Sequence, residues 1–285
     1  MAPVVFWNAQ RILELQDGPV NLRITSRTHG DIDTAAAEAA AEAAMGALRD
    51  LAPLRTLLSG PACRLTPEPA WPRVLRLMVE AAAATGDETL TPMAAVAGSI
   101  GQVALEAGLA AGVGTMVVEN GGDIALAVEP GDRVRVGIAR GIDDRRPSHR
   151  VTLDIGCGVG GVGTSGLGGR SFTRGVAAVA VAFSPTAATA DACATVLANA
   201  TFVAHPAVEQ ERAGLLDSAT DIPELWVTTR VAPLPDERVV QALRQARRTA
   251  GGLFRLGLLR GAFVAVQERT LVMPGTLAEP LGVAL

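Results

Sequence analysis

The chain has 285 residues, of which 49% are hydrophobic, and this content can bury a substantial core, so we predict a single domain over residues 1–285. A net charge of −4 and only 3% aromatic residues argue against a nucleic-acid-binding protein, which normally presents a basic face with stacking aromatics. All 25 basic residues are arginine and tyrosine is absent, which excludes chemistry based on a catalytic lysine or a Tyr/Lys pair.

The first part of the chain predicts one strand followed by three helices. From apolar alternation and alanine-rich runs we expect these elements at residues 20–28, 34–51, 72–85 and from 91 onward. Asp33 or Thr34 is suited to cap the first helix, and Thr91 to cap the third.

From residue 115 the apolar period changes to two. The expected strands are 115–119, 124–129, 133–140, 151–155, 176–183 and 225–229, with more within 253–272. Two further helices are expected at 186–204 and 236–250, the second ended by Gly251-Gly252. The first four strands would form a meander. Helices flanking mostly antiparallel hairpins predict an α+β fold.

Residues 92–118 imitate a membrane span, because they are apolar and long enough to cross a bilayer. Gln102 and Glu106 in the middle favour a buried helix followed by a strand. The N-terminus lacks a basic region followed by a long apolar core, and three widely spaced cysteines predict neither a disulfide framework nor a zinc site. We therefore expect a cytoplasmic protein with no membrane partner.

The most glycine-rich stretch is 154–170, DIGCGVGGVGTSGLGGR. Such a backbone can approach a ligand closely, so we interpret it as a loop around an anion. It also contains the G-x-G-x-x-G pattern of dinucleotide-binding proteins and resembles the first motif of a methyltransferase. Those two interpretations require a helix directly afterwards and an acidic residue about 20 positions further on, and neither is present. A tightly turning loop without a ligand is the remaining alternative.

A second polar segment, ENGGDI at 119–124, lies between two predicted strands. A plain hairpin turn explains its two glycines. It does not explain Glu119 and Asn120, which place polar groups beside an apolar strand. Together with Asp123, these residues are candidates for a site.

Asp191 and Thr195 are four residues apart in an alanine-rich helix, so they share one face. A carboxylate among alanines must be paired, hydrogen-bonded or metal-bound, and hard oxygen ligands suit Mg²⁺. The alternative is that Asp191 caps the helix or points to water.

In combination, TPMAAVAGSI (91–100), ENGGDI (119–124), GTSG (163–166) and ADACATVLAN (190–199) resemble the ApbE superfamily, the FAD:protein FMN transferases. The first segment points more narrowly to an uncharacterised ApbE-like branch. The resemblance implies an α+β fold related to a doubled T-fold, with antiparallel sheets and flanking helices. It also implies FAD and Mg²⁺ as cofactors, and a flavin nucleotide and a protein acceptor as partners.

The resemblance also implies roles for individual residues. Those matching the metal ligands are Asp191 and Thr195, and the cofactor-binding candidates are Asn120, Gly121, Gly122, Thr164, Ser165 and Gly166. The catalytic candidates come from the chemistry of the residues themselves: Glu119 and Asp123 could accept a proton, and Arg170 could neutralise charge. The sequence departs from the transferases because nothing between Gly166 and Asp191 matches their histidine-containing segment ending in Asp-Pro. It also departs from the uncharacterised branch, which has Gly-His-Ser where this sequence has Gly169-Arg170-Ser171.

Three hypotheses follow from the sequence. In the first, an ApbE-like protein binds a flavin nucleotide with Mg²⁺ and catalyses transfer or hydrolysis at the FAD pyrophosphate. In the second, the protein is a non-enzymatic accessory or cofactor carrier on the same fold. The third is a Rossmann-type methyltransferase, which the missing helix and acidic residue disfavour.

Overall fold

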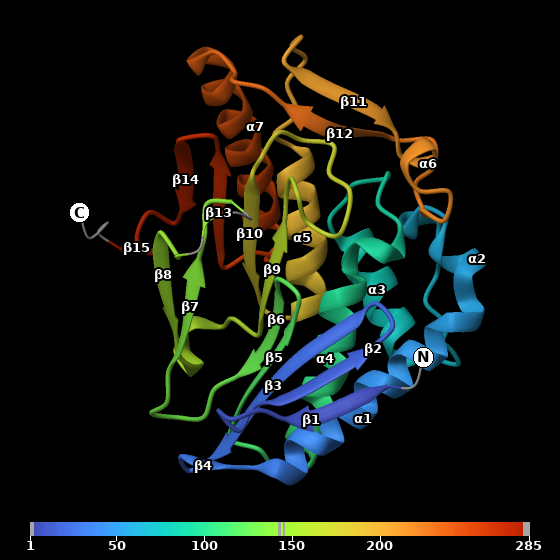
Figure 1. The fold of residues 1–285 in the computed structure, drawn as a ribbon, viewed down its shortest axis with the longest axis vertical. Helices are drawn as coiled ribbons and strands as arrows, with labels where there is room; N and C mark the ends of the chain where they lie inside the picture. Colours follow the sequence, from blue (N-terminus) through green and yellow to red (C-terminus); the bar gives the residue numbers. More distant parts are fainter. Residues whose placement is uncertain (1–2, 142–143, 145, 282–285) are drawn as a thin grey trace.

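The computed structural model describes residues 3–141, 144 and 146–281, and its centre is a ten-stranded sheet (Figure 1). The strand order is β1-β2-β3-β5-β6-β9-β10-β13-β14, with β4 paired to β3, and all these neighbours are antiparallel. The strands are β1 Val4–Trp7, β2 Leu13–Asp17, β3 Val20–Thr28, β4 Asp31–Ile32, β5 Thr115–Asn120, β6 Asp123–Ala127, β9 Gly161–Ser165, β10 Val179–Ser184, β13 Gly261–Val266 and β14 Arg269–Met273.

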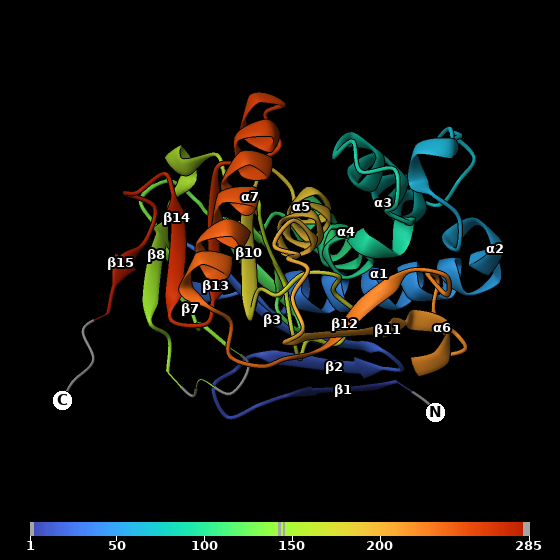
Figure 2. The ribbon, with the colours of Figure 1, turned by 90° about the horizontal axis from the view of Figure 1, so that it is seen from above.

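Helices form a layer against this sheet (Figure 2). In this layer α1 contacts α4, α4 contacts α5, and α5 contacts α7, while α3 packs against α4 and α5. The helices are α1 Thr34–Leu51, α3 Arg73–Ala84, α4 Val96–Ala110, α5 Ala187–Asn199 and α7 Asp236–Arg255, with short turns α2 Arg55–Leu58 and α6 Ala213–Leu216. The expected α+β class is confirmed.

Two smaller sheets complete the fold. One contains β7 Val134–Ile138, β8 His149–Leu153 and β15 Glu279–Pro280, and the other pairs β11 Val208–Arg212 with β12 Trp226–Val231. Strand β10 is covered on both faces. Val181 and Phe183 belong to a hydrophobic cluster with residues of β7 and β8. Ala180 and Ala182 belong to a second cluster with residues of α5 and α7. A strand buried on both faces has no polar alternation.

Several expected elements match the structure closely. The strand at 20–28 is β3 and the helix at 34–51 is α1. Asp33 is the cap of α1, because its side chain accepts the N–H of Ala36 at 3.0 Å. The apolar stretch 92–118 is a helix followed by a strand, as expected. Among the described residues, Pro92–Ala110 is the one helical stretch long and apolar enough to cross a membrane, and here it lies between α1 and α5.

Other expectations were wrong. The meander is divided, because β5 and β6 belong to the main sheet while β7 and β8 form a separate one. Helix α7 continues through Gly251-Gly252 to Arg255. Thr91 makes no capping bond, since its hydroxyl donates to Asp221 instead. The methyltransferase hypothesis is also wrong, because it needs a parallel sheet and the paired strands of the described residues are antiparallel.

Candidate functional site

We had expected the glycine-rich stretch to be a loop, but part of it is a strand. Gly161–Ser165 forms β9, which lies between β6 and β10 in the main sheet. A Cβ on Gly161 would lie 2.2 Å from Ala187 Cα, and one on Gly163 would lie 2.3 Å from the Ala190 carbonyl carbon. These glycines therefore let the backbone of α5 lie directly on the strand, which is a packing role rather than ligand contact.

A second close approach joins α5 to the start of α4. A Cβ on Gly98 would lie 2.3 Å from the Ala187 carbonyl oxygen and 2.8 Å from Asp191 Cβ. The Gly98 N–H donates to Asp191 Oδ2 at 2.9 Å. The carboxylate of Asp191 is therefore fixed between two helices, although the residue keeps part of its surface accessible to solvent. It does not cap α5, because Thr186 does so by accepting the Thr189 N–H at 3.3 Å.

The ENGGDI segment forms the hairpin between β5 and β6. Asn120 pairs with Asp123 across a Gly121-Gly122 turn, in which Gly121 has φ +75°. Asp123 Oδ1 accepts the Thr164 N–H at 2.9 Å, and Asn120 Nδ2 donates to the Ala97 carbonyl at 3.2 Å. The turn thus binds both β9 and the start of α4, which a plain hairpin turn would not need to do.

The hairpin brings Asp123 close enough to Asp191 for the two charges to interact. Burial raises the pKa of Asp123 to about 7, against the lowering effects of the Thr164 N–H and of Arg170. Burial and the neighbouring charge of Asp123 raise the pKa of Asp191 well above its usual value. Two carboxylates in such surroundings oppose each other's ionisation, and a bound cation would relieve this repulsion.

Arg170 supplies positive charge at the edge of this pair. Its Nη1 donates to the Pro19 carbonyl at 2.9 Å, and a Cβ on Gly121 would lie 2.2 Å from its Nη2. The absence of a side chain at Gly121 is therefore what lets the guanidinium cross the turn. The interaction with Asp123 acts through charge, since no ion pair joins the two among the described residues.

The remaining predicted residues have different surroundings. Glu119 is outside the acid pair, because its side chain is 38% exposed and lies 3.5 Å from Arg23. Thr195 lies one turn after Asp191 on α5 and is partly buried. Ser165 is buried at the end of β9. Gly166, with φ +138°, has no room for a side chain, since a Cβ would lie 2.6 Å from the Ala178 carbonyl oxygen.

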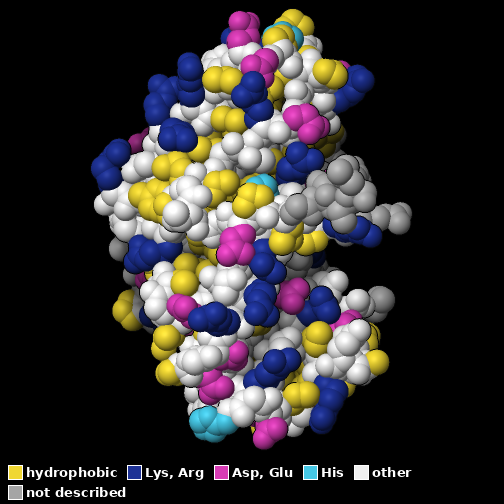
Figure 3. Space-filling view, turned by 90° about the vertical axis from the view of Figure 1, so that its left-hand side faces the viewer, with side chains coloured by type: hydrophobic (Ala, Val, Ile, Leu, Met, Phe, Trp, Pro, Cys, Tyr) yellow, Lys and Arg dark blue, Asp and Glu magenta, His cyan; other side chains and the backbone are white. Residues whose placement is uncertain are grey.

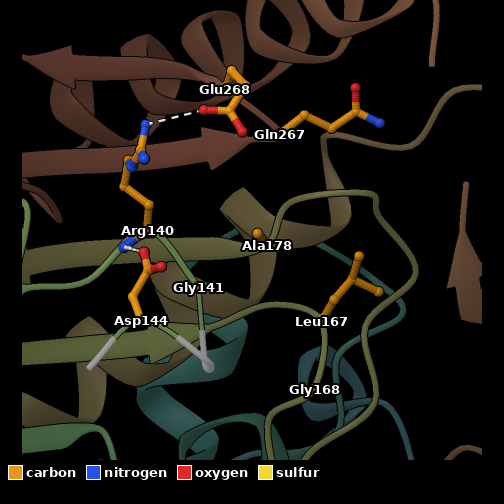
Figure 4. Close-up of a pocket in the computed structure, with 8 residues that line it drawn as sticks. All are labelled: Arg140, Gly141, Asp144, Leu167, Gly168, Ala178, Gln267 and Glu268. Atoms are coloured by element: carbon orange, nitrogen blue, oxygen red, sulfur yellow. Dashed lines mark hydrogen bonds and ion pairs between the residues drawn. The ribbon is translucent and has the colours of Figure 1, made fainter. Parts of the chain in front are cut away.

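One cavity near this site does not contain the acid pair. Its volume is about 440 Å³, and it is lined by Arg140, Gly141, Asp144, Leu167, Gly168, Ala178, Gln267 and Glu268 (Figure 4). Arg140 lies 3.4 Å from Glu268, so its charge is already balanced. Leu167 and Gly168 belong to the loop that carries Arg170.

Comparison with known proteins gives the family. A model described as "AbpE bacteria" matches residues 5–275. The chain belongs to this family. A UPF0280 protein of Methanosarcina barkeri is 38% identical over 176 residues, which is 59% of this chain and 67% of that protein. A UPF0280 protein of Methanosarcina acetivorans is 41% identical over 142 residues, 48% and 53% of the two chains. These matches span about half to two thirds of the curated relatives.

A solved structure is similar to this AbpE family member over nearly its whole length. The apo flavinyl transferase ApbE of Pseudomonas stutzeri aligns with a TM-score of 0.46 and 14% identity, covering 95% of this chain and 93% of that one. Because the identity and the TM-score are both low, the family assignment rests on the match of the family model to the sequence. This match confirms the resemblance drawn from the motifs.

The residues of this AbpE family site are suited to a hard divalent cation. No cluster of three or more His, Cys, Asp or Glu residues that could hold a metal occurs in the described part of the chain. Asp191 and Thr195, one turn apart on α5, offer a carboxylate and a hydroxyl oxygen. Mg²⁺ has this preference, because it keeps several waters and binds through one or two carboxylates plus phosphates.

Sequence analysis missed the backbone groups that complete the site. The Gly98 N–H and the Ala97 carbonyl hold Asp191 and Asn120 respectively. Their only signal is the run of small residues in AAVAGS, which indicates close packing but not a partner.

Proposed function

We propose that this protein binds a flavin nucleotide together with Mg²⁺ at the Asp123–Asp191 site and acts at the pyrophosphate, as a transferase or a hydrolase. One observation carries the proposal, namely that the carboxyl groups of the buried Asp123 and the half-buried Asp191 interact and that the pKa values of both are raised. The motif resemblance to flavin transferases, together with membership of the AbpE family, supplies the substrate class.

We assign each residue a role from its position. Asp191 and Thr195 would hold the metal, with the Gly98 N–H fixing the orientation of the carboxylate. Arg170, crossing the Gly121 turn, would add positive charge where a pyrophosphate needs it. When bound, Mg²⁺ would neutralise part of the pyrophosphate charge.

Asp123 is the best candidate for accepting a proton from an attacking hydroxyl or water. Its pKa of about 7 lies close to neutral pH, where a general base is most effective. Glu119 is less suited, because it is half-exposed and paired with Arg23. Hydrolysis would add water across the pyrophosphate and convert FAD into FMN and AMP. In transfer, a protein hydroxyl would take the place of the water.

The proposal is tested by calorimetric titration of FAD with and without Mg²⁺. We expect Mg²⁺ to strengthen binding, and Asp191→Asn to remove at least about tenfold of that gain. The control is Asp50→Asn, an exposed aspartate at the end of α1. Equal FAD affinity in wild type and Asp191→Asn, with no effect of Mg²⁺, would refute the metal site.

Product analysis separates the catalytic alternatives. We expect FMN transfer to a generic threonine-containing peptide to be absent or very slow, since the chain lacks the histidine segment of the transferases. A Mg²⁺-dependent gain of one FMN in the peptide mass, lost in Asp191→Asn, would establish the transferase. FAD that binds but stays intact over long incubation would favour the accessory or carrier function.

A further inference from the structure

The protein is acidic, but one of its surfaces is basic. Helix α7 contains five arginines and two acidic residues. Arg244 and Arg247 line a groove of about 310 Å³ between α7 and β14, together with Val240, Leu243, Arg269, Thr270 and Leu271. Figure 3 shows arginine and hydrophobic side chains interleaved on the upper part of the face that carries these elements.

The charges of two of these arginines are not balanced within the chain. Arg244 and Arg247 are exposed and form no ion pair with any described residue, whereas Arg269 is held by Asp236 through bonds of 2.5 and 2.9 Å. Like charges on neighbouring helical turns weaken a helix slightly, so the pair does not serve the stability of α7.

The same groove borders an open sheet edge. Strand β14 is the last strand of the main sheet, and it pairs with β13 from Val266↔Arg269 to Ala262↔Met273. Its outer edge has no partner strand in the described part of the chain. Every second N–H and C=O along that edge is therefore available to another strand.

We propose that this edge binds an extended acidic segment of a partner protein, which pairs with β14 and places alternate carboxylates against Arg244 and Arg247. Residues i and i+2 of a strand lie about 7 Å apart, and side chains three apart on a helix have Cβ atoms about 5–6 Å apart, so the two spacings are compatible. The apolar side chains of Val240, Leu243 and Leu271 provide a floor for such a segment.

Charge and shape favour this ligand over a small anion. An arginine fork binds a carboxylate through two parallel hydrogen bonds, and an acidic segment offers one carboxylate for each guanidinium. A free phosphate would leave the apolar floor and the strand edge unused. The inference is independent of the proposed flavin chemistry, since none of the groove residues belongs to the acid-pair site.

The test uses a fluorescein-labelled ten-residue peptide of alternating glutamate and valine, with fluorescence anisotropy at low salt. We expect Arg244→Gln/Arg247→Gln to weaken binding about tenfold, and Arg248→Gln, on the same helix but outside the groove, to change it less than twofold. All three positions are exposed, and circular dichroism checks the fold of each variant.

Two further experiments test separately whether the peptide pairs with β14 and whether its carboxylates are needed. A peptide N-methylated at every second residue keeps its carboxylates but lacks the donors on one edge, and we expect its affinity to fall about tenfold. Equal affinity of the methylated peptide would overturn strand pairing. Equal binding of a lysine–valine peptide, or complete competition by inorganic phosphate at the same charge concentration, would overturn the acidic-segment proposal.

Discussion

Replacing Asp123 by asparagine should stabilise the protein at neutral and alkaline pH. Asparagine keeps an oxygen that can accept the Thr164 N–H, which now donates to Asp123 at 2.9 Å, but it cannot become charged. In the wild type the ionised carboxylate is buried beside Asp191. The substitution removes this unfavourable charge and leaves the packing almost unchanged.

The magnitude follows from the two pKa values of Asp123. In the native state the pKa is raised from 3.8 to about 7. Below about pH 4 Asp123 is neutral in both the native and the unfolded state. As the pH rises from about 4 to about 7, the carboxyl group ionises in the unfolded state but stays neutral in the native state, so the free energy of unfolding falls until the native group also ionises. Between pH 4 and pH 7 the free energy of unfolding of the wild type therefore falls by about 4 kcal/mol, and about 2 kcal/mol of this loss has occurred by pH 5.

Urea denaturation without divalent cations measures the effect. We expect Asp123→Asn to raise the free energy of unfolding by about 4 kcal/mol at pH 8, by about 2 kcal/mol at pH 5, and by almost nothing at pH 3. The exposed Asp50→Asn serves as the control. A variant that is no more stable than the wild type at pH 8 would refute the reasoning. Saturating Mg²⁺ should narrow the difference, because its charge offsets the repulsion between the two carboxylates, which only the wild type has.

Two other predictions concern packing and thiol reactivity. Gly163→Ala should lower the free energy of unfolding by about 1–3 kcal/mol or more in urea, because its Cβ would lie 2.3 Å from the backbone of α5, whereas Gly60→Ala, with open space around it, should change it little. A small effect at Gly163 would show that α5 can move. Burial raises the pKa of the Cys193 thiol to about 12, so a thiol reagent at pH 8 should label the exposed Cys63 and Cys157 but not Cys193 in the native protein. Rapid labelling of all three cysteines would contradict the buried position.

The elements that sequence predicts best are those whose local pattern and burial agree. Strand β3 alternates buried and more exposed residues along most of its length, and α1 combines a capping aspartate with an alanine-rich sequence. Strand β11 is the opposite case, since its sequence VEQER lacks apolar alternation, and pairing with β12 determines its conformation. Local propensity carries no information about such a partner.

Strand β9 is the most informative wrong prediction, because we expected a loop there. Its sequence GVGTS resembles a loop, because glycine is disfavoured in strands. The close approach of α5 outweighs that preference, since only glycine leaves room for the helix backbone at Gly161 and Gly163. A single sequence cannot reveal this demand, because the helix that imposes it begins more than 20 residues later.

The contacts within the candidate site were equally impossible to predict from the sequence. Asp123 and Asp191 are recognisable as polar residues in apolar surroundings, but nothing in the sequence says that they interact. Their proximity arises because β6 lies beside β9 and α5 lies on β9. The Gly98 N–H is equally invisible, since every non-proline residue has such a donor.

Packing and electrostatics at this site have a common origin. The glycines of β9 and α4 let α5 approach so closely that the Asp191 carboxylate loses much of its contact with water, and this desolvation is the main reason for its raised pKa. A side chain added at Gly163 should move α5 outward, weaken the interaction between Asp191 and Asp123, and bring both pKa values closer to those of free carboxyl groups. Mg²⁺ affinity should then fall in Gly163→Ala, although no ligand has been changed. Normal Mg²⁺ affinity in a destabilised Gly163→Ala would mean that the carboxylates hold their positions independently of the helix packing.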